Sequence, residues 1–285
     1  MKNPRRKIDS SLTPFAQNDR KLTRSIRPQQ SLGQNFLRDE NIARKIVASL
    51  NAQPNDVVLE IGPGEAALTK YLAPQVCRLM VVDVDVRVIN RIHELYPNGD
   101  VEILHQDFLK TIFADILRQR NAAKLRIIGN IPYNITSPIL FHILDNRTHV
   151  SDATLMMQKE VARRLVAKPR TKDYGILAVF CQLFADVELL FDVSAKCFYP
   201  PPKVTSSVVQ LQMQDKIRYE LEDEQFFRKM VRAIFGKRRK TLRNSLSYFV
   251  DEIPPSLEKF DLQKRPEALS IQELVELGNA LYSAL

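Results

Sequence analysis

The sequence is short of cysteine and contains no tryptophan. Its three cysteines, Cys77, Cys181 and Cys197, are scattered through 285 residues, and no pair has the CxxC spacing. This pattern excludes a disulfide framework and a zinc ribbon, and it is typical of proteins from a reducing compartment. None of the four histidines belongs to an HExxH motif, so we expect no metal site.

Other absences exclude further classes of protein. The 8 glycines and 16 prolines are too few for a collagen-like or low-complexity chain. No run of about 18 apolar residues is present, so the sequence predicts no transmembrane helix. We therefore expect a cytoplasmic protein, acting as a monomer and without contact to a membrane.

Acidic residues are scarce in one stretch and absent from another, and these two stretches carry much of the net charge of +9. Residues 1–28 are rich in Lys and Arg and are predicted to form a basic, disordered tail. An organelle transit peptide is the minority alternative, which Asp9 and Asp19 disfavour. Residues 226–250 contain eight basic residues and no acidic one. Two basic zones on a nearly neutral body indicate a polyanionic partner such as nucleic acid, the alternative being solvated surfaces.

The middle of the chain, residues 29–213, alternates short apolar strands with amphipathic helices. This pattern predicts an α/β fold, a Rossmann-like and mostly parallel sheet with helices on both faces. Strands are predicted at 57–61, 79–82, 101–104, 125–128, 154–157, 187–191 and 204–213. Helices are predicted at 41–50, 66–73, 86–95, 113–120, 137–144, 160–167 and 174–184. After residue 214 only helical patterns remain, at 222–235, 240–249 and 271–281, which predicts a small all-helical domain over 214–285.

A glycine turn follows the first long strand. In the run EIGPG at 60–64, Gly62 and Gly64 would let the backbone approach a ligand. Asp83 ends the next strand, where a carboxylate can accept hydrogen bonds from both ribose hydroxyls of a nucleoside. Asp107 follows the third strand and can reach an adenine amino group. The alternatives are an ordinary turn and a helix N-cap, although Asp85 is the better N-cap.

The fourth strand ends in NIPYN at 130–134, which resembles the [DN]PP[YF] element of S-adenosylmethionine-dependent amino methyltransferases. An adenine N6 is a poor nucleophile, because its lone pair is delocalised into the ring. Two acceptors, the Asn130 side-chain oxygen and the Ile131 carbonyl, would favour a pyramidal nitrogen and stabilise the developing charge. Pro132 would fix the turn and Tyr133 would stack on the base. The alternative is a proline turn with a core tyrosine.

A second aromatic residue, Phe198, precedes Tyr199 and three consecutive prolines. The proline run is stiff, so we expect it to hold Phe198 out of the core. A base flipped out of its stack needs a ring on each side, and Tyr133 and Phe198 would supply them. The alternative is a core phenylalanine beside a loop.

Taken together, these motifs resemble the ribosomal RNA adenine dimethyltransferases, most closely the branch that modifies the small subunit. The matching segments occur in order along about four-fifths of the chain. They are GQNFL at 33–37, EIGPG at 60–64 with LT at 68–69, QDFL at 106–109, NIPYNI at 130–135, QKEVARRL at 158–165, YG at 174–175, FYPPPKV at 198–204, RRKTLRNSL at 238–246 and RPE at 265–267.

The resemblance implies S-adenosylmethionine as cofactor and dimethylation at N6 of two adjacent adenosines. The target would be a hairpin loop near the 3′ end of 16S rRNA in the immature 30S subunit. The implied catalytic residues are Asn130, Ile131, Pro132, Tyr133 and Phe198. The implied cofactor-binding residues are Asn35, Leu37, Gly62, Gly64, Asp83, Asp107 and Asn130.

The sequence departs from the family at two positions. Asp83 stands where the family usually has Glu, which would weaken the ribose contact or shift the cofactor. Ala66 replaces a glycine common in related methyltransferases, and we expect it to face a helix with little effect.

The C-terminal basic stretch favours the small-subunit branch over resistance-type enzymes that methylate 23S rRNA. A third reading is a ribosome-assembly factor for which methylation is secondary. The residues expected to bind rRNA phosphates are Arg228, Lys229, Arg232, Lys237, Arg238, Arg239, Lys240 and Arg243.

Overall fold

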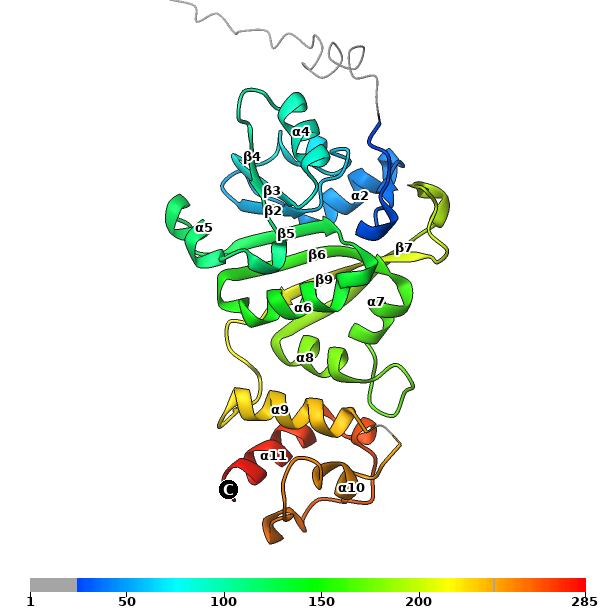
Figure 1. Ribbon diagram of the computed structural model, residues 1–285. Helices are drawn as coiled ribbons and strands as arrows, with labels where there is room; N and C mark the ends of the chain where they lie inside the picture. The colour runs from blue at the N-terminus through cyan, green and yellow to red at the C-terminus, as the bar shows by residue number, and fades with distance from the viewer. Residues whose placement is uncertain (1–24, 238) are drawn as a thin grey trace, which may run out of the picture.

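The computed structural model describes residues 25–237 and 239–285, and a seven-stranded sheet forms the centre of this part (Figure 1). The sheet order is β4-β3-β2-β5-β6-β9-β7. The first five strands run parallel, whereas β9 is antiparallel to both of its neighbours. The strands are β2 (Val57–Ile61), β3 (Arg78–Asp83), β4 (Val101–His105), β5 (Leu125–Asn130), β6 (Val150–Gln158), β7 (Ala185–Val193) and β9 (Ser206–Met213).

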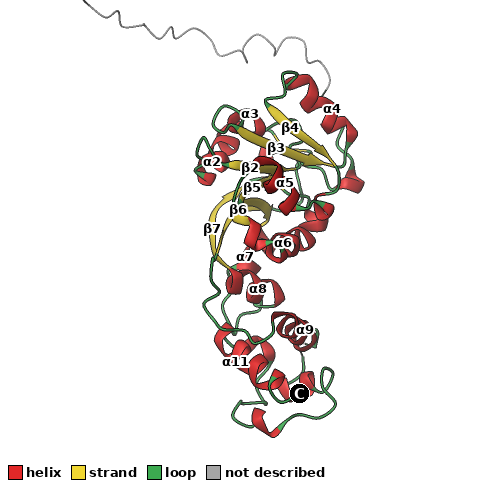
Figure 2. Ribbon diagram, turned by 90° about the vertical axis from the view of Figure 1, so that its left-hand side faces the viewer, coloured by secondary structure: helices red, strands yellow, loops and turns green. Residues whose placement is uncertain are grey.

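Helices cover both faces of this sheet, which confirms the predicted fold class (Figure 2). Alternate strand residues enter two hydrophobic clusters: Val58 belongs to one, and Leu59 to the other. The first cluster includes apolar residues of α2 (Glu40–Leu50) and α4 (Val86–Leu95). The second includes those of α5 (Phe113–Arg120), α6 (Thr136–Asp145), α7 (Lys159–Leu165) and α8 (Ile176–Phe184).

The ends of the sheet helices follow from local sequence. Asp39 caps α2, accepting hydrogen bonds from the backbone of Asn41 and Ile42, and Asp85 caps α4 through Arg87. The helix expected over 66–73 is wrong in length, because α3 covers only Thr69–Leu72. Ala66 has a left-handed backbone, φ +64°, so the chain forms a turn there before the helix begins.

A second, two-stranded sheet lies outside the predicted pattern. Strands β1 (Phe36–Leu37) and β8 (Phe198–Tyr199) pair antiparallel, with Phe36 opposite Tyr199 and Leu37 opposite Phe198. Two residues are too few to show a strand period in the sequence. The pair brings segments more than 160 positions apart to one side of the main sheet.

Three helices follow the last strand, namely α9 (Glu224–Phe235), α10 (Leu242–Leu246) and α11 (Ile271–Tyr282). Figure 1 shows them at the end of the molecule away from β4, with α9 facing α8. The Phe227 ring of α9 lies 6.4 Å from the Phe180 ring of α8, and Gly278 of α11 lets the two helices α9 and α11 approach closely. The core of the second cluster therefore continues into the C-terminal helices.

Short 3₁₀ turns complete the described chain: Gln30–Leu32, Phe108–Lys110, Tyr133–Ile135, Arg147–His149, Ala195–Cys197, Pro255–Leu257 and Pro266–Ala268. Within the predicted tail, Ile26 is buried and its backbone N–H donates to Glu65 Oε1 at 2.7 Å. Of that tail, residues 25–28 are described, and residues 1–24 lie outside the described residues. None of the helices in the described ranges is long and apolar enough to cross a membrane.

Candidate active site

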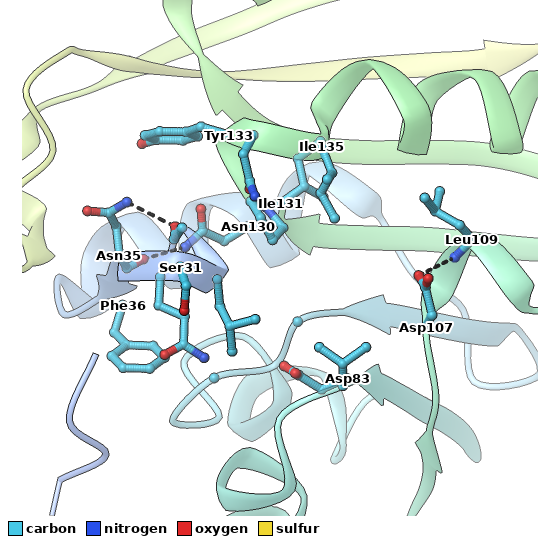
Figure 3. Close-up of a pocket in the computed structure, with 18 residues that line it drawn as sticks. Ser31, Asn35, Phe36, Asp83, Asp107, Leu109, Asn130, Ile131, Tyr133 and Ile135 are labelled. Carbon is cyan, nitrogen blue, oxygen red and sulfur yellow. Dashed lines mark hydrogen bonds between the residues drawn. The ribbon is translucent and has the colours of Figure 1, made fainter. Parts of the chain in front are cut away.

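A cavity of about 280 Å³ opens at the carboxyl ends of the parallel strands (Figure 3). Open α/β sheets bind their ligands at this edge. The structure brings most of the predicted catalytic and cofactor-binding residues to its wall. Those residues are Asn35, Gly62, Gly64, Asp83, Asp107, Asn130, Ile131, Pro132 and Tyr133. Figure 3 shows Asn130 beside Asn35, with Asp83 and Asp107 on the side away from Tyr133.

The glycine turn requires glycine for two reasons. Gly62 and Gly64 have φ of +65° and +56°, in the left-handed region that L side chains rarely adopt. A Cβ on Gly64 would also lie 2.9 Å from Cδ1 of Phe36. The turn therefore leaves bare backbone facing the cavity, where a ligand can come close.

Asp83 and Asp85 have different roles, since one caps a helix and the other faces the cavity. Asp85 caps α4 and is paired with Arg87 at 2.5 Å, which lowers the pKa of Asp85 to about 2. The prediction that Asp85 is the cap is thereby confirmed. Asp83 Oδ1 accepts a hydrogen bond from the Asp85 backbone at 2.8 Å, and burial raises the pKa of Asp83 to about 6. The Asp83 carboxylate therefore lies in a poorly hydrated position and has an oxygen available to accept a hydrogen bond from a ligand.

Asp107 is oriented in a similar way at the end of β4. Its Oδ1 accepts a hydrogen bond from the backbone of Leu109 at 2.9 Å, and this holds the carboxylate at the start of a 3₁₀ turn. Both residues line the cavity. A nucleoside held between Asp83 and Asp107 would meet one carboxylate at each end.

Asn130 is held so that its oxygen is available. Its Nδ2 donates to the Asn35 carbonyl at 2.9 Å, which fixes the orientation of the amide. Among the described residues, none donates a hydrogen bond to Asn130 Oδ1 or to the Ile131 carbonyl. The Ile131 backbone N–H donates to Met156 of β6 at 3.1 Å, which anchors the turn. Two unpaired acceptors thus lie next to each other at the cavity wall.

The Tyr133 side chain is fixed at its hydroxyl end. Its hydroxyl lies 2.6 Å from Ser206 Oγ, at the start of β9. Burial raises the pKa of this phenol, so the hydroxyl stays protonated. The ring is therefore a neutral, rigid aromatic surface at the cavity.

The structure corrects the expectation for Phe198 and places Leu37 differently from the other residues. Phe198 is only 4% exposed and packs in the hydrophobic cluster, because β8 pairs with β1 and turns this side chain inward. Tyr199, the next residue, is 54% exposed. Leu37 borders an adjoining space of about 20 Å³ together with Gly62 and Gly64.

Sequence reasoning missed several residues of the cavity wall, including Gly33, Gln34, Phe36 and Asn134. Gly33 has φ +64°, and a Cβ there would lie 2.8 Å from Asn134 Oδ1. Gln34 Nε2 donates to Asp85 Oδ2 at 2.8 Å, which ties this segment to the N-terminus of α4. For residues 33–36, the sequence offers only the glycine of the GQNFL segment, which indicates a turn but does not show that the turn faces the cavity.

The expectation for Arg228 is also corrected. Its side chain is 9% exposed, and its guanidinium is paired with Asp145 at 2.7 Å and with Glu224 at 2.9 Å. It also lies over the Phe184 ring, 4.7 Å from the centroid. Arg228 therefore joins α9 to the sheet domain and is turned away from any phosphate.

The other basic residues of this zone are exposed, apart from Arg238, which lies outside the described residues. They are Lys229, Arg232, Lys237, Arg239, Lys240 and Arg243. Arg232 lies over the Phe141 ring at 5.5 Å, and Lys237 over the Tyr248 ring at 4.6 Å. In the part of the chain that the structure describes, no group of three His, Cys, Asp or Glu residues could hold a metal ion.

Comparison with known proteins decides what this site belongs to. The model of the family "Ribosomal RNA adenine dimethylase" matches residues 26–272, which include every predicted site residue. The chain belongs to this family. Its members are S-adenosylmethionine-dependent methyltransferases that act on rRNA adenine, so the protein is an enzyme.

Individual relatives support the same assignment. The "Ribosomal RNA small subunit methyltransferase A" of Chlorobium phaeobacteroides (strain BS1) is 47% identical over 90% of this chain and 94% of its own. A dimethyladenosine transferase from Plasmodium falciparum has a TM-score of 0.72 and 27% identity, over 85% of this chain and 95% of its own. The 23S rRNA methyltransferase ErmE has a TM-score of 0.65 and 26% identity, over 87% and 100%.

Proposed function

We propose that this adenine dimethylase transfers methyl groups to N6 of two adjacent adenosines in a hairpin loop near the 3′ end of 16S rRNA. The small subunit is favoured over the large one because the relative named for it is 47% identical, whereas the 23S enzyme is 26% identical. The proposal includes an immature 30S subunit as substrate, a monomeric enzyme and a cytoplasmic location, as the sequence leads us to expect.

The cavity fits an adenosyl cofactor. Asp83 would accept the ribose hydroxyls and Asp107 the adenine amine, while the glycine turn would contact the rest of the cofactor through Gly62 and Gly64. A Cβ at Gly64 would collide with the Phe36 ring, so position 64 itself presents only backbone to the cofactor. Asn35 and Leu37 would complete the wall. S-adenosylmethionine supplies the methyl group as an electrophile when it is bound.

The observation that carries the proposal is the pair of unpaired acceptors at the end of β5. Asn130 Oδ1 and the Ile131 carbonyl would accept hydrogen bonds from the target NH₂ group, and they would stabilise positive charge as the methyl group arrives. The bound cofactor would supply the methyl group, and the amine held by Asn130 and Ile131 would release one N6 proton to solvent for each methyl group that it receives. Pro132 sets the position of Tyr133, whose ring would lie against the flipped base. The buried Phe198 would support β8 from behind.

The exposed basic residues of the C-terminal helices would bind rRNA phosphates. Contacts of this kind make affinity fall steeply with salt. Figure 1 shows the C-terminal helices at one end of the molecule, beyond the sheet domain that contains the cavity. We therefore expect these residues to position the RNA, whereas the sheet domain carries out the methyl transfer.

The Asn130→Ala variant tests the mechanism. Removing one acceptor should lower kcat by roughly 10²- to 10³-fold. Cofactor binding, measured by calorimetry, should be retained, since the turn at 62–64 and Asp83 are untouched. Methyl transfer at the wild-type rate would remove Asn130 from the mechanism, and loss of cofactor binding would show that its role is structural.

A further inference from the structure

An exposed tyrosine, Tyr199, lies next to the active-site cavity and takes no part in the proposed methyl transfer. Tyr199 is 54% exposed, and its Cα is paired with that of Phe36 across the small β1–β8 sheet. Phe36 lines the cavity, and the preceding residue, Asn35, accepts the hydrogen bond from the Asn130 amide. Tyr199 is therefore one strand away from the segment that orients the catalytic asparagine.

The pairing of β1 with β8 decides which aromatic ring faces outward. Residues directly opposite each other in an antiparallel pair project from the same face. Leu37 and Phe198 share one face and are both buried in the hydrophobic cluster. Phe36 and Tyr199 share the other face, on which Phe36 is buried and lines the cavity whereas Tyr199 is exposed to solvent. Tyr199 is thus the aromatic residue of β8 whose ring is exposed.

The backbone around Tyr199 is held firmly in place. Both Arg38 and Asp39 donate backbone hydrogen bonds to the Cys197 carbonyl, at 2.8 and 3.3 Å. The Arg38 guanidinium lies 5.8 Å from the Tyr199 ring centroid and is itself paired with Glu65 at 2.5 Å. Three prolines follow directly, at 200–202. Because the backbone at this position is already ordered, stacking of another ring on Tyr199 would cost only the conformational entropy of its side chain.

The chain segment that carries Tyr199 is positively charged. Residues 194–205 contain Lys196 and Lys203, both exposed, and no acidic residue. Proteins bind single-stranded nucleic acid by stacking bases on aromatic rings while nearby cations contact the phosphates. The segment 194–205 carries both features beside the cavity in which the target base would react.

We propose that Tyr199 stacks on the base of a nucleotide that flanks the target adenosine, while Lys196 and Lys203 contact the adjoining phosphates. The target base itself has to reach Asn130 inside the cavity, and Tyr199 is outside the residues that line it. The flanking base is therefore the one within reach of this ring. This inference rests on the proposed function, and it adds a contact that would hold the loop open on one side.

The first experiment uses fluorescence. The chain has no tryptophan, so Tyr199→Trp introduces a single reporter at the proposed stacking position. Addition of an RNA hairpin with two adjacent loop adenosines should quench its emission. Tyr282→Trp is the matched control, because Tyr282 is also exposed but lies on α11 near the C-terminal end. Equal responses from both variants, or no response from either, would contradict the proposal.

The second experiment measures affinity. Tyr199→Ala should bind the hairpin roughly 5- to 100-fold more weakly, whereas Tyr199→Phe should bind like the wild type. With a hairpin that carries an abasic site in place of the flanking nucleotide, the wild type and the alanine variant should bind equally. Unchanged affinity of Tyr199→Ala, or a loss that persists with the abasic hairpin, would refute stacking.

Cofactor binding by calorimetry and the circular dichroism spectrum should be unchanged in Tyr199→Ala, which separates stacking from misfolding. The two proposals also fail differently. If the wild type methylates adenine and Tyr199→Ala binds RNA normally, only the stacking inference is wrong. If the wild type produces no methyladenosine, the proposed function is wrong whatever Tyr199 does.

Discussion

A buried carboxyl group beside the glycine turn gives the stability of this protein a predictable dependence on pH. Glu60 of β2 is 1% exposed, and its Oε2 accepts a hydrogen bond from Thr69 Oγ1 at 2.7 Å. Burial raises the pKa of Glu60 from its ordinary value of 4.5 to about 8, and the hydrogen bonds from Thr69 offset this only in part. At neutral pH Glu60 is therefore protonated in the folded protein and ionised in the unfolded chain.

The direction of the effect follows from linkage. Because the folded pKa of Glu60 is the higher one, the protonated group favours folding at low pH. This contribution is complete below about pH 4.5 and is lost as the pH rises toward 8. At pH 7 the folded state has lost about 3 kcal/mol relative to acidic pH. Glu60→Gln has the shape of the protonated group and does not titrate, so it escapes this loss.

The assay is thermal unfolding of wild type and Glu60→Gln, without cofactor, at several values between pH 5 and pH 7. All other groups titrate in both proteins, so the difference between them isolates Glu60. The stability of the variant relative to the wild type should rise by about 2–3 kcal/mol over this range, or about 5–10 °C in Tm. Parallel curves for the two proteins would refute the reasoning, because Glu60 would then have an ordinary pKa.

Two further predictions concern charged residues with different roles. Arg228→Ala should destabilise the protein by about 1–3 kcal/mol in chemical denaturation, because the variant loses the ion pair with the half-exposed Asp145 and the packing over the Phe184 ring, while Glu224 keeps its ion pair with Arg147. Arg243→Ala should leave stability unchanged and flatten the salt dependence of RNA binding. If Arg228→Ala weakened RNA binding and left stability unchanged, Arg228 would belong to the RNA interface. Burial raises the pKa of Asp83 to about 6, so its carboxylate is neutralised between pH 7 and pH 5, and cofactor affinity measured by calorimetry should fall several-fold over this range. The Asp83→Asn variant should show no such change. If wild type and variant have identical pH profiles, Asp83 does not contact the cofactor.

The sequence predicts the main sheet well because its strands are buried on both faces. The strand over 57–61 and the helices over 86–95 and 113–120 agree with the structure to the residue. The cavity wall is predicted for a related reason, since the carboxyl ends of parallel strands meet at one edge. Asp83, Asp107 and Asn130 follow three such strands and reach the same cavity.

What the sequence did not predict depends on contacts between distant segments. The outward side of β8 is fixed by its pairing with β1, so the sequence could not show that Phe198 is buried and Tyr199 exposed. Arg228 looked like one more cation in a basic run, and its acidic partner Asp145 lies 83 positions away. Ala66 was expected to matter little, yet it adopts a left-handed conformation in which glycine is the usual residue.

The central claim is that this enzyme dimethylates adenosines of small-subunit rRNA. The direct test is mass spectrometry of nucleosides after incubation of the protein and S-adenosylmethionine with unmethylated immature small subunits, with large-subunit RNA treated in parallel. The account predicts N6,N6-dimethyladenosine in the small-subunit sample alone. Dimethyladenosine in the large-subunit sample alone, or no methylated product in either sample, would contradict it.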